Sequence, residues 1–200
     1  MVIIACGALA REIIELQKLN EWSHIDLRCI PAQIHNYPKK IANAVEEKII
    51  EVKKEGKDMF VAFADCGTGG QLDAVLERHQ VKRLPGAHCY EFYATSPLFN
   101  DLMEKELGTF FLTDFLARHF DALILEGMGI NEYPELQDMY FAHYTKLVYL
   151  SQGYNPYLLK NAQKAAERLG LKFEHRHTGF GDLETSLNVI MNSTSTGGAV

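Results

Sequence analysis

The sequence predicts an α/β protein: an open, mostly parallel sheet of about five to six strands with helices on both faces, Rossmann-like or flavodoxin-like. Short apolar runs alternate with amphipathic segments along the chain, which is typical of strands buried between helices. The clearest unit is a strand over Phe60–Ala64, a turn with three glycines, and a helix that begins at Gln71. The N-terminus repeats this design, with a strand over Val2–Ala5, then Cys6-Gly7, then a helix.

The other elements follow from the same two periodicities. Continuous apolar or alternating runs predict strands at 2–5, 25–30, 60–64, 81–87, 146–151 and 171–177. Apolar residues at helical spacing predict helices at 8–19, 39–54, 71–80, 98–107, 110–120, 133–144 and 157–169. Ser96-Pro97 is a typical helix start, and Gly170 is a typical C-terminal cap. Residues 121–126 fit either a helix extension or a further strand.

The composition is that of an ordinary soluble protein with one domain. With 200 residues and no repeats, we expect a single α/β domain over 1–191 and a flexible tail over 192–200, frayed or serving as a binding arm. The net charge of -6 argues against nucleic acid or an anionic membrane as a partner. No apolar run is long enough to span a membrane, and no basic leader precedes the first strand, so we expect a cytoplasmic protein.

Three of the four cysteines follow predicted strands. Cys6, Cys66 and Cys89 lie at or just beyond strand ends, whereas Cys29 lies inside a strand and is interpreted as structural. The carboxyl ends of parallel strands share one edge of a sheet, where ligands bind. With strands about 4.8 Å apart and the order 2-1-3-4, the three thiols would converge there. We therefore predict them to be metal ligands.

Three thiolates would leave a coordination position open, as in catalytic zinc sites. Zinc is the predicted cofactor, and a [4Fe-4S] cluster, which tolerates a wider triangle of sulfurs, is the alternative. Polar side chains near the strand ends are candidates for a fourth ligand or for proton transfer, namely His35, Asp65, His88 and Glu91. The glycine-rich turn and two tyrosines near the third cysteine are the candidates for binding a small, anionic substrate: Gly67, Thr68, Gly69, Gly70, Tyr90 and Tyr93.

Two other interpretations of the cysteines stay open. A single nucleophilic thiol, Cys66 or Cys89, would act with a histidine base, and Cys66 precedes a helix N-terminus that would lower its pKa. Alternatively, all four cysteines are separate buried thiols that act as small hydrophobic side chains.

Four motifs resemble one prokaryotic family, called domain of unknown function 1638. They are Ile-Ala-Cys-Gly-Ala-Leu-Ala-Arg-Glu (4–12), Asp-Cys-Gly-Thr-Gly-Gly-Gln-Leu-Asp (65–73), His-Cys-Tyr-Glu-Phe-Tyr (88–93) and Leu-Thr-Asp-Phe-Leu-Ala-Arg-His-Phe-Asp (112–121). The resemblance continues through residues 178–184 and covers nearly the whole chain. It implies a setting in one-carbon metabolism, beside corrinoid-dependent methyl-transfer systems.

The residues and the resemblance together favour a metal-dependent enzyme, with methyl transfer to or from a small thiol or amine as the preferred reaction. A cluster-dependent lyase or desulfurase is the enzymatic alternative. A third hypothesis is an accessory protein that carries a metal, cluster or corrinoid for a corrinoid-dependent methyltransferase. Against carriage of the corrinoid itself, the sequence has no Asp-x-His-x-x-Gly signature. The oligomeric state stays open.

Overall fold

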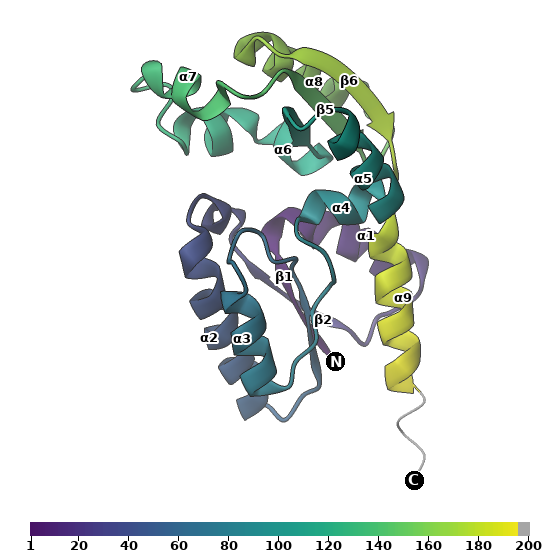
Figure 1. Cartoon of the computed structure of the whole chain (residues 1–200). Helices are drawn as coiled ribbons and strands as arrows, with labels where there is room; N and C mark the ends of the chain where they lie inside the picture. The colour runs from purple at the N-terminus through teal and green to yellow at the C-terminus, as the bar shows by residue number, and fades with distance from the viewer. Residues whose placement is uncertain (196–200) are drawn as a thin grey trace. The chain divides into compact units, whose positions relative to one another are not determined.

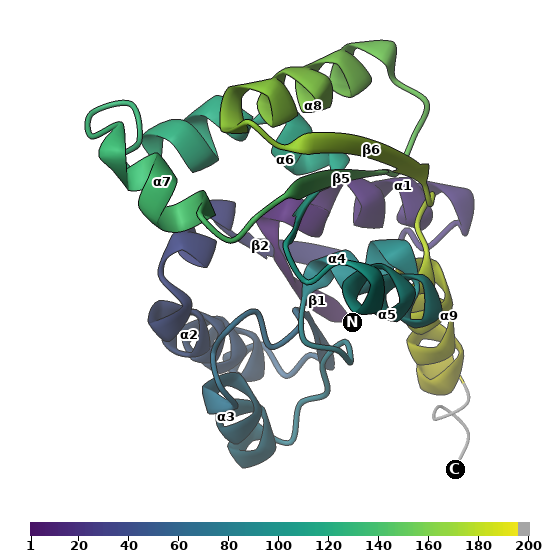
Figure 2. The same ribbon diagram turned by 45° about the horizontal axis from the view of Figure 1, so that its top comes forward.

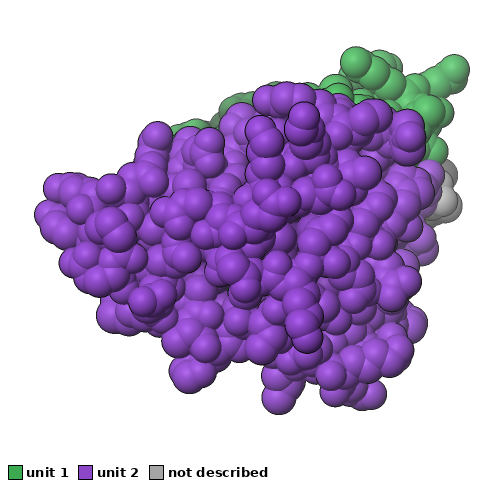
Figure 3. Space-filling view, turned by 90° about the horizontal axis from the view of Figure 1, so that it is seen from above, with its two compact units in different colours: residues 1–89 green, residues 90–200 purple. Residues whose placement is uncertain are grey.

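The computed structural model of this chain describes residues 1–195 and the side chains of residues 1–191. The chain divides into two compact units, Met1–Cys89 and Tyr90–Val200 (Figure 3). Each unit has a parallel sheet of its own. The expectation of one domain over 1–191 stays a prediction. Of the predicted tail, residues up to Ser195 belong to the last helix, and residues 196–200 lie outside the described residues.

The sheet of the first unit has three parallel strands in the order β2-β1-β3 (Figure 1). They are β1 (Val2–Cys6), β2 (Asp26–Ile30) and β3 (Met59–Ala62). Val2 pairs with Asp26 on one side and with Met59 on the other. The strand predicted at 81–87 is reduced to one parallel bridge between Arg83 and Val61, on the outer side of β3. The carboxyl end of each strand leads into a loop that belongs to the candidate site.

Helices cover both faces of this sheet. The elements are η1 (Gly7–Leu9), α1 (Ala10–Leu19), η2 (Ala32–Asn36), η3 (Pro38–Lys40), α2 (Ile41–Lys54) and α3 (Gln71–His79). Helices α2 and α3 lie side by side in both ribbon views (Figures 1 and 2). Helix α1 lies on the opposite face from α2, as right-handed crossovers that run in opposite directions require. Fully buried side chains such as Ile3, Ile13, Ile49 and Phe63 form the core between these layers.

The second unit also has three parallel strands, in the order β4-β5-β6. They are β4 (Thr109–Leu112), β5 (Lys146–Ser151) and β6 (Lys172–His177). The helical elements are α4 (Cys89–Ala94), α5 (Ser96–Lys105), α6 (Asp114–Arg118), the π-helical η4 (Asp121–Glu126), α7 (Glu135–Phe141), α8 (Pro156–Leu169) and α9 (Asp182–Ser195). One buried cluster joins Leu147 and Tyr149 to α6, η4 and α8, and another joins Val148 and Leu150 to α4 and α5.

The α/β class is confirmed, but the single sheet of five to six strands is replaced by two smaller sheets. The helix predicted over 110–120 is also wrong in its first half. Thr109–Leu112 is strand β4, and a helix begins only after Thr113, whose hydroxyl accepts a hydrogen bond from Leu116 N at 3.4 Å. The aromatic pair Phe110-Phe111 suits a pleated strand as well as an apolar helix face, so periodicity over this short run does not distinguish a strand from a helix. Residues 121–126 are π-helical.

Among the described residues, no helix has the length and apolar character that a membrane span requires.

A candidate metal centre in the first unit

Three side chains of the first unit gather into a group that fits a metal ion. One ligand atom from each of His35, Cys66 and Cys89 lies within 4.8 Å of the other two. The two sulfur atoms are 3.4 Å apart. Tetrahedral zinc with Zn–S bonds near 2.3 Å would need sulfurs about 3.8 Å apart. The donor set and its spacing therefore suit a small thiophilic ion after a shift of a few tenths of an ångström.

The turn after β3 places Cys66 in this group. Two backbone bonds fasten the turn to the following segment, from Asp65 N to Gly86 O at 3.2 Å and from Cys66 N to Ala87 O at 2.9 Å. They bring Cys89, two residues after Ala87, beside Cys66. Cys66 itself has a φ of 50°, in the left-handed region that side chains with a Cβ rarely adopt. Such a conformation costs free energy and is concentrated at functional sites.

His35 lies on the short helix η2, in the loop that follows β2. Its Nδ1 atom is 3.1 Å from the carbonyl oxygen of Ala32 and 3.6 Å from the sulfur of Cys6. A proton on Nδ1 that is donated to Ala32 leaves the lone pair on Nε2. A ring nitrogen held by a backbone carbonyl, with the other nitrogen free to coordinate, is the usual arrangement of a metal-binding histidine. The sequence offered His35 as a fourth ligand or a proton-transfer group, and the structure places it among the three candidate ligands.

The charges of the group are strongly interdependent. A hydrogen bond from Cys89 and the nearby His35 lower the pKa of Cys66 to about 5, although burial opposes this. The same bond and burial raise the pKa of Cys89. Burial would lower the pKa of His35, but the Cys6 and Cys66 sulfurs raise it to about 11. One thiolate at Cys66 beside an imidazolium is therefore the favoured state of the metal-free group, and the protons on the other two ligands must leave when an ion binds.

The other two cysteines have different surroundings. The Cys6 sulfur accepts a hydrogen bond from Ala8 N at 3.3 Å and faces Nδ1 of His35, so it touches the group without being one of its three members. Its predicted role as a metal ligand stays a prediction. Cys29 is exposed on β2. The interpretation of four separate buried thiols does not fit this arrangement, because one thiol is exposed and two are in contact.

Asp65 holds the glycine-rich turn together. Its carboxylate accepts hydrogen bonds from Thr68 Oγ1 at 2.5 Å, from Gly70 N at 3.1 Å and from Gly69 N at 3.2 Å. The bond from Thr68 lowers the pKa of Asp65, with smaller help from the two amides. Two N–H groups that we expected to meet an anionic substrate thus donate to a carboxylate of the chain itself. The predicted substrate role of Gly67, Thr68, Gly69 and Gly70, and the catalytic role of Asp65, stay predictions.

The segment after Cys89 continues into the second unit. His88 is exposed, and its charge helps to lower the pKa of Cys66. In the second unit, Glu91 accepts a hydrogen bond from Ser96 Oγ at 2.8 Å, Tyr90 stacks on Phe111, and Tyr93 is almost fully buried. These contacts give the last three side chains packing roles. Their predicted parts in catalysis and substrate binding stay predictions.

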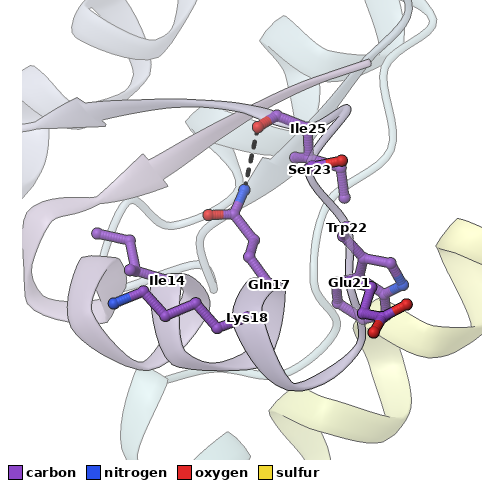
Figure 4. A pocket seen from close by; sticks show the side chains of 7 residues that line it. All are labelled: Ile14, Gln17, Lys18, Glu21, Trp22, Ser23 and Ile25. Atoms are coloured by element: carbon purple, nitrogen blue, oxygen red, sulfur yellow. Dashed lines mark hydrogen bonds between the residues drawn. The ribbon is translucent and has the colours of Figure 1, made fainter.

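The first unit also has a surface hollow (Figure 4). It is formed by the C-terminal half of α1 and the turn to β2, with Ile14, Trp22 and Ile25 among its walls. Gln17 crosses it and donates to Ile25 O at 3.1 Å. Helix α1 starts near Cys6, at the carboxyl edge of the sheet, so its C-terminal half lies toward the opposite edge. The hollow is therefore not part of the candidate metal centre.

Comparison with known proteins gives one match. A family model described as Protein of unknown function (DUF1638) matches residues 29–187, a stretch that contains His35, Cys66 and Cys89 but not Cys6. No curated protein and no solved structure was found to match this chain.

Proposed function

This chain belongs to the family described as Protein of unknown function (DUF1638), and we propose that it is a metal-dependent enzyme whose ion is held by His35, Cys66 and Cys89. One observation carries the proposal: three ligand atoms from three separate segments of the chain lie within 4.8 Å of one another at the carboxyl edge of a parallel sheet. Three protein ligands leave a position for water or substrate, which is the arrangement of a catalytic site.

A single zinc ion fits this group better than a cluster. In a [4Fe-4S] cluster each thiolate binds a different iron, so the sulfurs stand further apart than ligands of one ion. The 3.4 Å between Cys66 and Cys89 is close to the spacing of two sulfurs on one zinc, about 3.8 Å. Two thiolates and an imidazole are also a common zinc ligand set. A [4Fe-4S] cluster stays the alternative cofactor.

Methyl transfer to a small thiol is the reaction that we propose. When bound, the ion would supply the positive charge that keeps a substrate thiol ionised at neutral pH. The thiolate attacks the methyl carbon, the bond from that carbon to the donor breaks, and the electron pair stays with the donor. The exposed His88, in its neutral form, takes the thiol proton. The donor is a methylated amine or a methylated corrinoid on a partner methyltransferase, and the reducing cytoplasm would keep the cysteines free.

Metal analysis of protein purified without oxygen tests the binding part of this proposal. We expect about one zinc per chain, and loss of most of it in His35→Ala, Cys66→Ser and Cys89→Ser. Cys29→Ser is the matched control, since it removes an exposed thiol outside the group and should keep the metal. Retention of zinc in all three ligand variants would refute the site. Detection of iron with acid-labile sulfide would show that the cofactor is a cluster and not zinc. Cys6→Ser decides whether the third sulfur that was predicted as a ligand binds the ion or braces His35.

Turnover separates an enzyme from an accessory protein. The zinc-loaded chain should methylate a small thiol from a methylated donor, and His88→Gln should slow this reaction while keeping the metal. Turnover only in the presence of a stoichiometric methyltransferase would favour the accessory function.

The contact between two sulfurs also favours a second candidate, a redox-active dithiol. The Cys66 thiolate would attack a small-molecule disulfide and release one thiolate. Cys89 would then attack the mixed disulfide, so that the protein gains an S–S bond and the reagent gains two electrons. Two results together would favour this candidate over the first. The protein would hold no metal after anaerobic purification, and Cys66 and Cys89 would form a disulfide at the reduction potential of the cytoplasm.

A further inference from the structure

A second cluster of ligating side chains lies in the other unit, at the carboxyl end of its sheet. His175 and His177 are exposed on the edge strand β6. They pair with Tyr149 and Ser151 of the parallel neighbour β5. Because side chains alternate along a strand, these four residues stand on one face of the sheet. Glu174 and Arg176, which form an ion pair with each other, belong to the other face.

Both imidazole rings point a nitrogen at the same oxygen. Ser151 Oγ is 2.9 Å from His175 Nε2 and 3.1 Å from His177 Nδ1. A hydroxyl has one proton and can donate to only one of the rings, so the other ring must donate its N–H to the oxygen. Two ring nitrogens from β6 therefore meet one hydroxyl oxygen from β5.

The surroundings hold this arrangement in place. The His175 ring stacks on Tyr149, with ring centres 5.2 Å apart and an angle of 21° between the planes. The Tyr149 hydroxyl donates to the buried Asp114 at 2.6 Å, and Asp114 also accepts from Gln152 N and Gly153 N. Ser151 is itself 3% exposed. The oxygen and one ring are thus fixed from the protein side, while both histidines are open to solvent.

We propose that His175, His177 and Ser151 form a second metal site, which takes a divalent transition-metal ion such as zinc, cobalt or nickel through nitrogen and oxygen ligands. With bonds near 2.1 Å, neighbouring ligand atoms of such an ion are about 3.0 to 3.4 Å apart. Of the two observed oxygen–nitrogen spacings, 3.1 Å lies within this range and 2.9 Å lies just below it. Imidazole favours these ions over magnesium and calcium. The solvent side would be completed by water, which leaves the ion open to a ligand.

The test uses the full chain with Cys66→Ser and Cys89→Ser, so that the centre of the first unit cannot contribute. Titration with cobalt(II) should show one ion bound, with visible absorption bands and without the near-ultraviolet charge-transfer band that thiolate ligands give. Zinc should displace it. His175→Ala and His177→Ala, made in this background, should each weaken binding at least tenfold. His143→Ala, an exposed histidine of the same unit, should leave the affinity unchanged.

Circular dichroism of each variant shows whether it has folded, and the exposed positions of both histidines make this the expected result. Equal cobalt affinity in all three histidine variants would overturn the proposal, as would binding weaker than millimolar in the double-cysteine background. The outcome is independent of the first centre, because the background lacks its two sulfur ligands.

Discussion

The two sheets have the same number of parallel strands but different routes through them. In the first unit, β1 lies in the middle, and the chain moves to one side for β2 and to the other for β3. The connections therefore diverge at the carboxyl end, which makes the crevice where open α/β sheets bind ligands. In the second unit the chain passes from β4 to β5 to β6 in one direction, so the described strands of this sheet show no such divergence.

This difference explains why the two candidate sites are built differently. The ligands of the first unit come from segments beyond the strand ends: His35 from η2, Cys66 from the turn after β3, and Cys89 from the first residue of α4. In the second unit, His175, His177 and Ser151 belong to the strands themselves, at their carboxyl ends. A site on loops depends on what fastens the loops, and a site on strands depends on the register of the sheet. At each sheet edge, an aspartate that follows a strand accepts several hydrogen bonds: Asp65 in the first unit and Asp114 in the second. Comparing substitutions of these two aspartates tests whether the two sites depend on different parts of the structure.

Asp114→Ala should have the largest effect on stability. Asp114 is 9% exposed and accepts bonds from the Tyr149 hydroxyl and from the amides of Gln152 and Gly153. Its removal leaves three donors without their partner and separates the ends of β4 and β5. We expect the free energy of unfolding to fall by about 3 kcal/mol. Urea denaturation followed by circular dichroism measures it.

Two further variants control this experiment. Tyr149→Phe removes one of the three donors and should cost about 1 kcal/mol, and Asp121→Ala, at an exposed position of the same unit, should cost almost nothing. Trp22 is the single tryptophan and lies in the first unit. If residues 1–191 are one cooperative domain, as predicted, its fluorescence will shift to lower urea together with the circular dichroism in Asp114→Ala. An unchanged fluorescence transition would show that the units unfold separately.

Asp65→Ala should have a smaller effect, although its carboxylate also accepts three hydrogen bonds. All three come from its own turn, and Asp65 is only partly buried, so water can replace the lost oxygen atoms. We expect a loss of about 1 to 2 kcal/mol, as for a helix cap. Asp65→Asn keeps an oxygen acceptor and should recover part of it. A loss as large as that of Asp114→Ala would mean that the different burial of the two aspartates does not determine how much each stabilises the protein.

Sequence patterns placed the members of the first site near one edge of a sheet, but they did not indicate the second site. Cys66 and Cys89 could be placed at one edge because each follows an apolar run, and His35 because it follows the strand that ends at Ile30. The position of His35 in the group, with its Nδ1 atom near the sulfur of Cys6, depends on the fold of the loop. The pair His175 and His177 was included in a predicted strand, but its partner Ser151 is 24 residues away and meets it only through strand pairing. Periodicity indicates where strands lie but not which strands pair with each other. For this reason the strands of two sheets were predicted to form a single sheet.

The smallest effect on stability is expected for the ion pair between Asp73 and Arg83. The segment that carries Cys89 has one bridge to β3, and Arg83 fastens it by donating to Leu84 O at 2.7 Å and to both oxygens of Asp73, at 2.6 and 3.0 Å. Asp73 is 55% exposed, and solvent screens the pair. Asp73→Asn should therefore lower the free energy of unfolding by less than about 1 kcal/mol at pH 7.

The pH dependence of this loss identifies the ion pair as its cause. The hydrogen bond from Arg83 lowers the pKa of Asp73 below its usual value of 3.8. A lowered pKa contributes stability that is fully present above pH 3.8 and disappears as the pH falls through the pKa of the folded state. The difference in stability between wild type and Asp73→Asn should thus shrink toward zero in acid. Glu77→Gln, on the exposed side of the same helix, is the matched control for the removal of one carboxylate. A difference that persists in acid would mean that Asp73 acts through packing, and that the Cys89 segment is held by its backbone alone.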